Sequence, residues 1–153
     1  MNETMQLRRG AAADAAAIRA LTREAYAKWV PLIGREPKPM AADYAQALRD
    51  HRFDLLTLDG VLAALIETIA HADHLLIENV AVSPSFQRRG LGRMLMAHAE
   101  ALAVASGLGE VRLYTNKRFA ENQQLYGRLG YEVDREEAFS GGVVVHMSKR
   151  VRS

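Results

Sequence analysis

Residues 80–95 read VAVSPSFQRRGLGRML and join a predicted strand to a predicted helix. An apolar run typical of a buried strand stops at Ser83-Pro84. A short polar turn with two arginines and two glycines follows, and an amphipathic helix pattern then begins. A strand that passes through a glycine-bearing turn into a helix N-terminus is suited to holding an anion.

The turn has three features that favour a phosphate or pyrophosphate ligand. Backbone N–H groups at a helix N-terminus lack intrahelical partners and lie at the positive end of the helix dipole. Glycines allow a ligand to approach that backbone closely. Arg88, Arg89 and Arg93 add positive charge beside it. A tight strand-to-helix turn without any ligand would explain the same glycines, so both interpretations stay open.

Two common nucleotide motifs do not match the turn. The Walker A loop, G-x-x-x-x-G-K-[ST], is absent from the sequence. The dinucleotide fingerprint needs a third glycine, but Gly90-Leu91-Gly92 continues into Arg93-Met94-Leu95. The anion is therefore expected to belong to another class of ligand.

Composition limits the classes of function. The chain has 153 residues, of which 49% are hydrophobic and 25% charged, as expected for one globular domain over residues 1–153. The formal net charge is +2 without a dense Lys/Arg run, so no nucleic-acid partner is indicated. Cysteine is absent, which excludes disulfides, thiolate metal sites and a cysteine nucleophile.

The sequence also predicts a soluble, cytoplasmic protein with no membrane partner. The N-terminal residues MNETMQLRRG lack the apolar core of a signal peptide. No run approaches the ~20 apolar residues that a membrane-spanning helix needs.

Periodicity and turn residues give an order of elements. Asp59-Gly60 between two strand-like runs predicts a hairpin. Strands are expected at 5–8, 53–58, 61–69, 74–82, 111–115, 131–134 and 143–147. Helices are expected at 14–30, 41–50, 91–106 and 120–129, with a loop over 31–40. This order predicts an α/β fold with a mixed, mainly antiparallel sheet flanked by helices.

The turn and the chain that follows it resemble a known family. Gln87-Arg88-Arg89-Gly90-Leu91-Gly92 is similar to the Q/R-x-x-G-x-G/A pyrophosphate loop of the GNAT superfamily of acyl-CoA-dependent N-acetyltransferases. The stretches LYTN at 113–116, ENQQLY at 121–126 and LGY at 129–131 resemble its strand–helix–strand segment. The resemblance is specific from about residue 75 to 149, whereas the first half matches only in the order of elements.

The resemblance implies transfer of the acetyl group from acetyl-CoA, as co-substrate, to a primary amine in a ternary complex. Backbone groups of the strand before the turn would pair with pantetheine, provided a neighbouring strand splays away there. The cofactor-binding residues implied are Val80, Ala81, Val82, Gln87, Arg88, Arg89, Gly90, Leu91, Gly92, Arg93, Asn122 and Tyr126. No metal is expected, because His71, Asp73 and His74 are too few to form a convincing metal site.

Tyr126 is the candidate general acid. Asn122 and Tyr126 are four residues apart on a predicted helix and so share one face. A tyrosine hydroxyl can donate a proton or a hydrogen bond to a departing thiolate, and the equivalent tyrosine in the family implies this role. Packing of Tyr126 beside Leu125 and Leu129 in the core is the alternative.

Glu78 is the candidate general base, which must remove a proton from the acceptor ammonium. Strict alternation places its side chain on the same face as Val80 and Val82. A strand carboxylate paired with an arginine is the alternative. Several members of the family carry a glutamate on the strand over 111–115, where this chain has Tyr114.

Acceptor recognition is predicted in the aromatic and Pro/Gly-rich region between the first two helices. Such loops often line binding sites, although aromatic helix packing beside a surface loop would give the same pattern. The candidate substrate-binding residues are Tyr26, Trp29, Ile33, Arg35 and Tyr44.

Two alternatives to small-amine acetylation stay open. The chain could be a non-catalytic acyl-CoA-binding module, or it could acetylate a protein or peptide amine. Since no cysteine can form an acyl-enzyme, sequential kinetics are expected. The Gly141-Gly142 hairpin also raises the possibility of a homodimer.

Overall fold

The computed structural model describes residues 4–139 and 141–152, and within them seven strands form one sheet. The strands are β1 (Met5–Arg9), β2 (Arg52–Leu58), β3 (Val61–Ala70), β4 (Leu75–Val82), β5 (Glu110–Asn116), β6 (Glu132–Phe139) and β7 (Gly142–Arg150). The α-helices are α1 (Ala15–Tyr26), α2 (Val30–Ile33), α3 (Lys38–Ala41), α4 (Tyr44–Asp50), α5 (Leu91–Ala105) and α6 (Ala120–Arg128). The 3₁₀ turns are η1 (Ala12–Asp14), η2 (Ala27–Trp29) and η3 (Pro84–Phe86).

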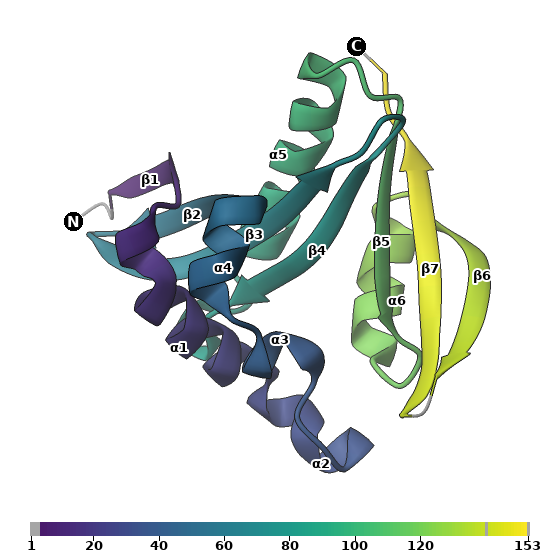
Figure 1. The fold of residues 1–153 in the computed structure, drawn as a ribbon, viewed down its shortest axis with the longest axis horizontal. Helices are drawn as coiled ribbons and strands as arrows, with labels where there is room; N and C mark the ends of the chain where they lie inside the picture. Colours follow the sequence, from purple (N-terminus) through teal and green to yellow (C-terminus); the bar gives the residue numbers. More distant parts are fainter. Residues whose placement is uncertain (1–3, 140, 153) are drawn as a thin grey trace.

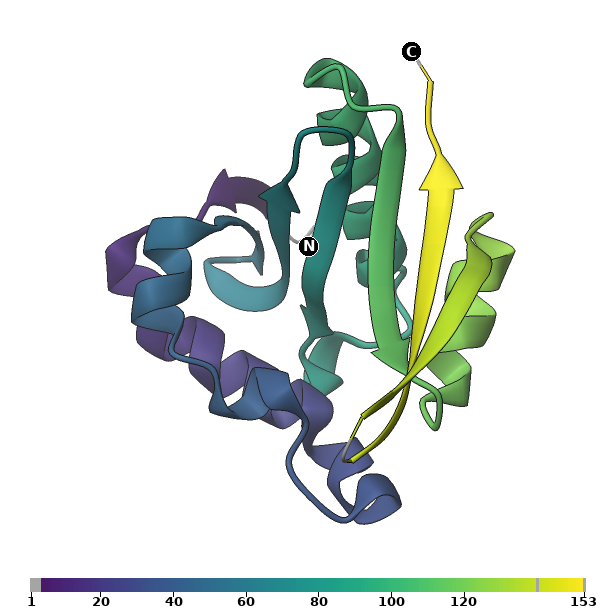
Figure 2. The same ribbon diagram turned by 45° about the vertical axis from the view of Figure 1, so that its right-hand side comes forward.

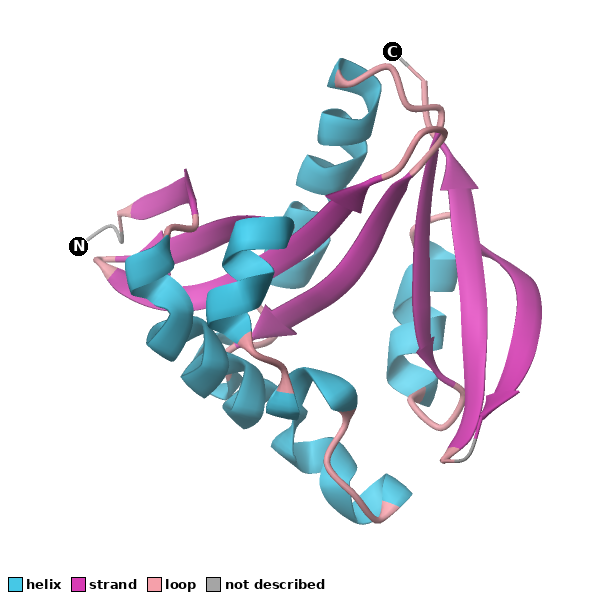
Figure 3. Ribbon diagram, in the orientation of Figure 1, coloured by secondary structure: helices cyan, strands magenta, loops and turns pink. Residues whose placement is uncertain are grey.

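The sheet is mixed and mainly antiparallel, as the sequence predicts. Its order is β1-β2-β3-β4-β5-β7-β6, and β4 with β5 is the parallel pair while the other neighbours run antiparallel. Figures 1 and 2 show that the sheet opens between β4 and β5, with β1–β4 on one side and β5, β7 and β6 on the other. Figure 3 shows helices on both faces of this sheet.

Two apolar clusters hold the helices against the sheet. The larger cluster lies under α5 and includes Leu56, Ile77, Leu95 and Leu113. The smaller cluster lies on the opposite face, where Ile18 of α1 packs with residues of α4, β2 and β3. The helices α5 and α6 therefore cover one face of the sheet, while α1 and α4 cover the other (Figure 1).

The hairpin predicted at Asp59-Gly60 is confirmed. Asp59 has φ 51° and Gly60 has φ 80°, the pair of positive values that a type I′ turn requires. Leu58 pairs with Val61 across the turn, so β2 ends and β3 begins directly beside it.

The segment between α1 and β2 differs from the prediction. The structure ends α1 at Tyr26, and the expected loop contains the short helices α2 and α3. Pro31 and Pro39 lie in the first turns of these helices, where proline is tolerated because its missing N–H would be unpaired anyway. The expected helix at 41–50 starts only at Tyr44, because Asp43 caps it by accepting a hydrogen bond from Gln46 N at 3.2 Å.

The buried face of α5 is formed by Leu91, Leu95, Met96, Ala99 and Ala103, whereas Met94 is 46% exposed. The closing strands β6 and β7 are longer than predicted, because the charged run at 135–137 lies in an exposed edge strand. Charged side chains are common on such edges since they oppose pairing with other chains.

Candidate active site

The site is built around the place where β4 and β5 separate. The two strands pair only from Leu75–Val111 to Ile77–Leu113. On its other edge β4 continues to pair with β3 as far as Val82. Within the described residues, the β5-facing backbone of Val80–Val82 therefore has no strand partner, so the splay on which pantetheine pairing depends is present (Figures 1 and 2).

A β-bulge at Glu78 changes which side chains face the splay. Glu67 of β3 pairs with Asn79 and Thr68 pairs with Ile77, so Glu78 is an extra residue in β4. Val80 and Val82 pack against the cluster under α5. The prediction that Glu78 shares their face is wrong, because the bulge interrupts the alternation of side chains.

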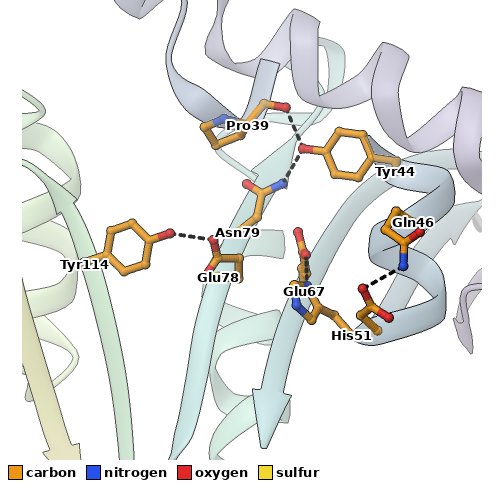
Figure 4. Close-up of polar contacts among 9 residues, drawn as sticks. Pro39, Tyr44, Gln46, His51, Glu67, Glu78, Asn79 and Tyr114 are labelled. Atoms are coloured by element: carbon orange, nitrogen blue, oxygen red, sulfur yellow. Dashed lines mark hydrogen bonds and ion pairs between the residues drawn. The ribbon is translucent and has the colours of Figure 1, made fainter. Parts of the chain in front are cut away.

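Glu78 is directed instead toward β5 and the face covered by α4. The hydroxyl of Tyr114 donates a hydrogen bond of 2.5 Å to Glu78 Oε1. Burial, reinforced by the neighbouring Glu78 carboxylate, raises the pKa of Tyr114 far above its usual value. Tyr114 therefore stays protonated and holds Glu78 at the opening of the sheet (Figure 4).

The turn from β4 to α5 has the backbone shape of an anion site. Arg88 has φ 66° and Gly90, the N-cap of α5, has φ 78°. Met94 N donates to Gly90 O at 3.0 Å to begin the helical ladder, so the N–H groups of residues 91–93 precede it. The first turn of α5 carries no acidic side chain that would compensate the positive end of the helix.

The side chains of the turn leave its surface positively charged. Arg88, Arg89 and Arg93 are exposed, and the Arg89 guanidinium lies 5.3 Å from the centre of the Phe86 ring. Gln87 Nε2 donates a 3.4 Å hydrogen bond to Val82 O, which ties the turn to the end of β4. These residues fit a pyrophosphate group, because backbone donors and cations surround one helix N-terminus.

Helix α6 places Tyr126 and Asn122 on the β5 side of the splay, on the same sheet face as α5. Tyr126 is half-buried, packs against the larger cluster and meets Tyr131 edge-on at 6.3 Å between ring centres. Burial raises the pKa of Tyr126 to about 12. The hydroxyl is therefore protonated at neutral pH and can donate, while the ring also has the packing role that was the alternative.

A hydrogen-bonded network on the opposite face links β4 to the first helices. Asn79 is 3% exposed, and its Oδ1 accepts a 2.8 Å hydrogen bond from the Tyr26 hydroxyl. Its Nδ2 donates to the Tyr44 hydroxyl at 3.4 Å, and that hydroxyl donates to Pro39 O at 2.6 Å. Asn79 was not predicted as a site residue, although an amide inside the apolar strand pattern ENVAV is a signal of a buried polar partner.

The other predicted acceptor residues lie where the first half of the chain meets the second. Trp29 is buried and stacks on Phe119, with ring centres 4.3 Å apart. Ile33 is half-buried at the end of α2. Arg35 is exposed, lies 5.3 Å from the Phe139 ring centre and donates to Gly141 O at 3.5 Å. Tyr26 and Tyr44 are thus joined by Asn79, whereas Trp29 and Arg35 contact the segments around α6 and the β6–β7 hairpin.

A carboxylate beside this network forms a second polar pair. Glu67 is buried on β3 opposite Asn79, and its Oε2 lies 2.6 Å from His51 Nδ1 (Figure 4). Burial raises the pKa of Glu67, and the hydrogen bond from His51 opposes that rise. His51 could not be identified as a site residue beforehand, because its partner is 16 residues away and the pairing depends on the β2–β3 hairpin.

Comparison with protein families matches this architecture. The model of the acetyltransferase (GNAT) family covers residues 16–131 of the chain. The chain belongs to the GNAT acetyltransferase family. The resemblance inferred from the turn and from the strand–helix–strand segment is thereby confirmed.

Solved GNAT structures share the fold over nearly the whole chain. The PaiA N-acetyltransferase of Thermoplasma acidophilum in complex with coenzyme A has a TM-score of 0.81 and 17% sequence identity, covering 96% of this chain and 99% of that one. The ribosomal-protein-S18-alanine N-acetyltransferase of Escherichia coli has a TM-score of 0.80 and 21% identity, covering 98% and 96%. At these identities the likeness establishes the fold alone.

Curated GNAT relatives match one part of the chain. The [ribosomal protein bS18]-alanine N-acetyltransferase of Salmonella typhimurium is 38% identical over 76 residues, and that of Escherichia coli K12 is 34% identical over 76 residues. These matches span 50% of this chain and 51% of each relative, so the chain spans about half the length of the curated relatives it matches.

The described residues contain neither a candidate membrane-spanning helix nor a candidate metal-binding group. No helix among them combines the length and the apolar character that crossing a bilayer requires. In the same part of the chain, no three or more His, Asp or Glu side chains group so that they could hold a metal ion.

Proposed function

We propose that residues 1–153 form a single acetyl-CoA-dependent N-acetyltransferase domain that acetylates a primary amine by direct attack in a ternary complex. The observation that carries this proposal is the convergence of three features on one opening of the sheet. The positively charged turn at the N-terminus of α5, the unpaired edge of Val80–Val82 and the Glu78 carboxylate all belong to β4 or directly follow it.

Each part of the opening has a role in binding acetyl-CoA. The backbone N–H groups of the turn, with Arg88, Arg89 and Arg93, would hold the pyrophosphate. The unpaired backbone of Val80–Val82 would hydrogen-bond the pantetheine amides, and one N–H there would stabilise negative charge on the thioester oxygen during attack. Gln87, Leu91 and Gly92 complete the turn, and Asn122 would contact the pantetheine.

Glu78 would take a proton from the acceptor ammonium, leaving a neutral amine to attack the thioester carbonyl. An alkyl ammonium has a pKa of about 10, so an unassisted amine is mostly protonated at neutral pH. The bulge directs Glu78 toward the opening, and Tyr114 fixes one of its oxygens. The amide product forms as the carbon–sulfur bond breaks, the electron pair stays on sulfur, and the second proton of the attacking nitrogen passes to the thiolate or to water.

Tyr126 would stabilise the departing thiolate. Its pKa of about 12 lies well above the value of about 8.5 typical of a thiol, so complete proton transfer from Tyr126 to the sulfur is unfavourable. A hydrogen bond from the hydroxyl to the sulfur is favourable at any pH where the tyrosine is neutral. We therefore assign Tyr126 as the donor to the leaving group.

The acceptor would enter from the side of the first helices. Tyr26 and Tyr44 line the Asn79 network, while Trp29, Ile33 and Arg35 lie on the segment that reaches α6 and the β6–β7 hairpin. The curated relatives carry the name of an enzyme that acetylates an alanine of a ribosomal protein. A polypeptide amine is therefore the second candidate acceptor, beside a small primary amine.

The test is a steady-state assay of acetyl-CoA turnover with small amines and with a peptide that begins with alanine. The proposal expects turnover with at least one class and intersecting double-reciprocal plots, as direct transfer in a ternary complex requires. Parallel plots would contradict direct transfer. Binding of acetyl-CoA without turnover of any acceptor would favour a non-catalytic acyl-CoA-binding module. Cytoplasmic location and a homodimer remain predictions.

A further inference from the structure

A second buried carboxylate lies close to Glu78 and has no role in the reaction described so far. Glu67 is 4% exposed on β3, where only the hydrogen bond of 2.6 Å to His51 Nδ1 pairs its side chain among the described contacts. Burying an ionised carboxylate is unfavourable unless hydrogen bonds or opposite charges replace its lost solvation. The burial of Glu67 is therefore expected to serve a structural or functional purpose.

The surroundings of Glu67 connect it to the proposed reaction. Its backbone pairs with Asn79, the residue after the bulge, so Glu67 and Glu78 lie on neighbouring strands beside each other. The charge of Glu78 acts on Glu67, since it adds to the rise in the pKa of Glu67. The tyrosines that face this pair are Tyr44 of α4, Tyr26 of α1 and Tyr114 of β5.

His51 gives this pair a connection to solvent. His51 is the residue before β2, and its side chain is 27% exposed, while the Glu67 side chain is 6% exposed. Figure 4 shows the paired Glu67 and His51 side chains beside Glu78, and the exposed part of the imidazole extends this group toward solvent. Histidine has an ordinary pKa near 6.5 and exchanges protons readily at neutral pH.

Every turnover leaves Glu78 with one proton that it must lose before it can act again. One Glu78 oxygen already accepts the Tyr114 hydrogen bond, and Tyr114 cannot accept the proton because its hydroxyl is itself protonated. A carboxylate partner beside Glu78 would provide a path away from the acceptor.

We propose that Glu67 and His51 form a proton-exit pair that returns Glu78 to its ionised state after each acetyl transfer. This inference rests on the proposed function. Glu78 gives up the proton and becomes a carboxylate, and the Glu67 carboxylate takes it up through solvent between the two side chains. A half-turn of the His51 ring then presents its unprotonated Nε2 to Glu67, which passes the proton on, and the imidazolium releases its Nδ1 proton to bulk water. His51 again donates a hydrogen bond to the ionised Glu67, now from Nε2, so the pair is ready for the next turnover.

The roles of the two residues make different predictions for pH. Glu67 must be ionised to accept a proton, so kcat falls as the pH drops through the Glu67 pKa. The hydrogen bond from His51 lowers that pKa, so His51→Ala should move the acid limb of kcat to higher pH. Glu67→Gln should lower kcat and remove the part of the acid limb that depends on Glu67. Both residues are positioning residues, because neither has to touch the acceptor.

The experiment measures kcat and KM between pH 5 and 9 for the wild-type protein, Glu67→Gln and His51→Ala. We expect a loss of roughly tenfold in kcat for each variant, smaller than the 10²–10⁴-fold range typical of direct general acid–base catalysis. KM for acetyl-CoA should stay unchanged. Added imidazole should restore kcat of His51→Ala but not of Glu67→Gln, since only the former leaves a carboxylate to pass the proton on.

A matched control is another short His–carboxylate pair away from the opening. His74 Nδ1 lies 2.6 Å from Asp73 Oδ1 at the β3–β4 hairpin, and Asp73→Asn should leave the kcat profile unchanged. Combining Glu67→Gln with Glu78→Gln should lower kcat no further than Glu78→Gln alone, because both act on one proton path.

The outcomes separate this inference from the function on which it rests. Wild-type turnover with unaltered pH profiles in both variants, or the same loss with no imidazole rescue, would overturn the proton-exit pair alone. A wild-type protein that binds acetyl-CoA and acetylates no amine would overturn both proposals. Thermal unfolding of each variant identifies a loss that comes from misfolding, and His51→Gln then provides a second variant that keeps a polar side chain beside Glu67.

Discussion

The two sides of the opening between β4 and β5 are built by different means. On the cofactor side the important groups belong to the backbone: residues 91–93 of α5, Gly90 with its positive φ, and the unpaired edge of β4. On the acceptor side the important groups are side chains, joined by the hydrogen bonds of Asn79 to Tyr26 and Tyr44. The partners of Asn79 are 53 and 35 residues away in sequence.

This difference determines how each side responds to change. A backbone site within about a dozen consecutive residues depends on a few glycines and on the helix end. A site of side chains from separate elements depends on how those elements pack, so its residues can vary while the backbone side stays the same. We infer that cofactor binding and acceptor binding can be altered separately, and the predictions below test that separation.

The largest effect is expected from Tyr126→Phe. Loss of the donor to the departing sulfur should lower kcat by about 10²-fold or more, with the affinity for acetyl-CoA nearly unchanged. Steady-state kinetics and calorimetric titration measure the two effects. Tyr131→Phe is the control, because Tyr131 is buried against Tyr126 and donates to Glu100 Oε2 instead. An equal kcat for wild type and Tyr126→Phe would remove Tyr126 from the mechanism.

On the acceptor side, Asn79→Ala should lower both stability and acceptor binding. The change leaves the half-buried Tyr26 hydroxyl without its acceptor, which costs about 1–3 kcal/mol. The KM for the acceptor should rise while the affinity for acetyl-CoA stays the same. Chemical denaturation and separate KM measurements check this, and Tyr44→Phe should have the smaller effect since Tyr26 keeps its bond. A rise in the KM for acetyl-CoA alone would contradict the separation of the two sides.

Gly90 and Gly92 should differ in what their replacement by alanine changes. Gly90→Ala places a side chain at φ 78° and should destabilise the fold by about 1–2 kcal/mol. Gly92 has no positive φ, and an added Cβ would lie 3.7 Å from Val82 Cγ2, which is ordinary contact. Gly92→Ala should therefore keep its stability and weaken acetyl-CoA binding. Thermal unfolding and calorimetry distinguish them, and a Gly92→Ala protein with unchanged affinity would show that the ligand does not approach this residue.

The smallest effect concerns stability at high pH. Burial raises the pKa of both Tyr44 and Tyr126 to about 12 in the folded protein, above the value of about 10 expected in the unfolded chain. The unfolded state loses these protons first, so the free energy of unfolding should fall as the pH rises from 10 toward 12. Tyr126→Phe should make this fall shallower. Denaturation curves at several pH values measure the slope, and identical slopes for the two proteins would contradict the burial of Tyr126.

The features that could be predicted from the sequence are those that depend on residues close together along the chain. The turn at 87–92 and the hairpin at Asp59-Gly60 follow from local pattern, and the structure contains both. The bulge at Glu78 could not be predicted, because it arises from the pairing of β4 with β3 and not from any residue in β4. His51 and Asn79 were missed for the same reason, since their partners come from other elements.

The turn over residues 87–93 is proposed to bind the pyrophosphate of acetyl-CoA. The most direct test is calorimetric titration of the folded protein with acetyl-CoA, with ATP and NAD as controls for other phosphate ligands. We predict selective binding of acetyl-CoA that weakens in Gly92→Ala. No binding of acetyl-CoA by protein shown to be folded, or equal binding of all three ligands, would contradict the claim and the site assignments that depend on it.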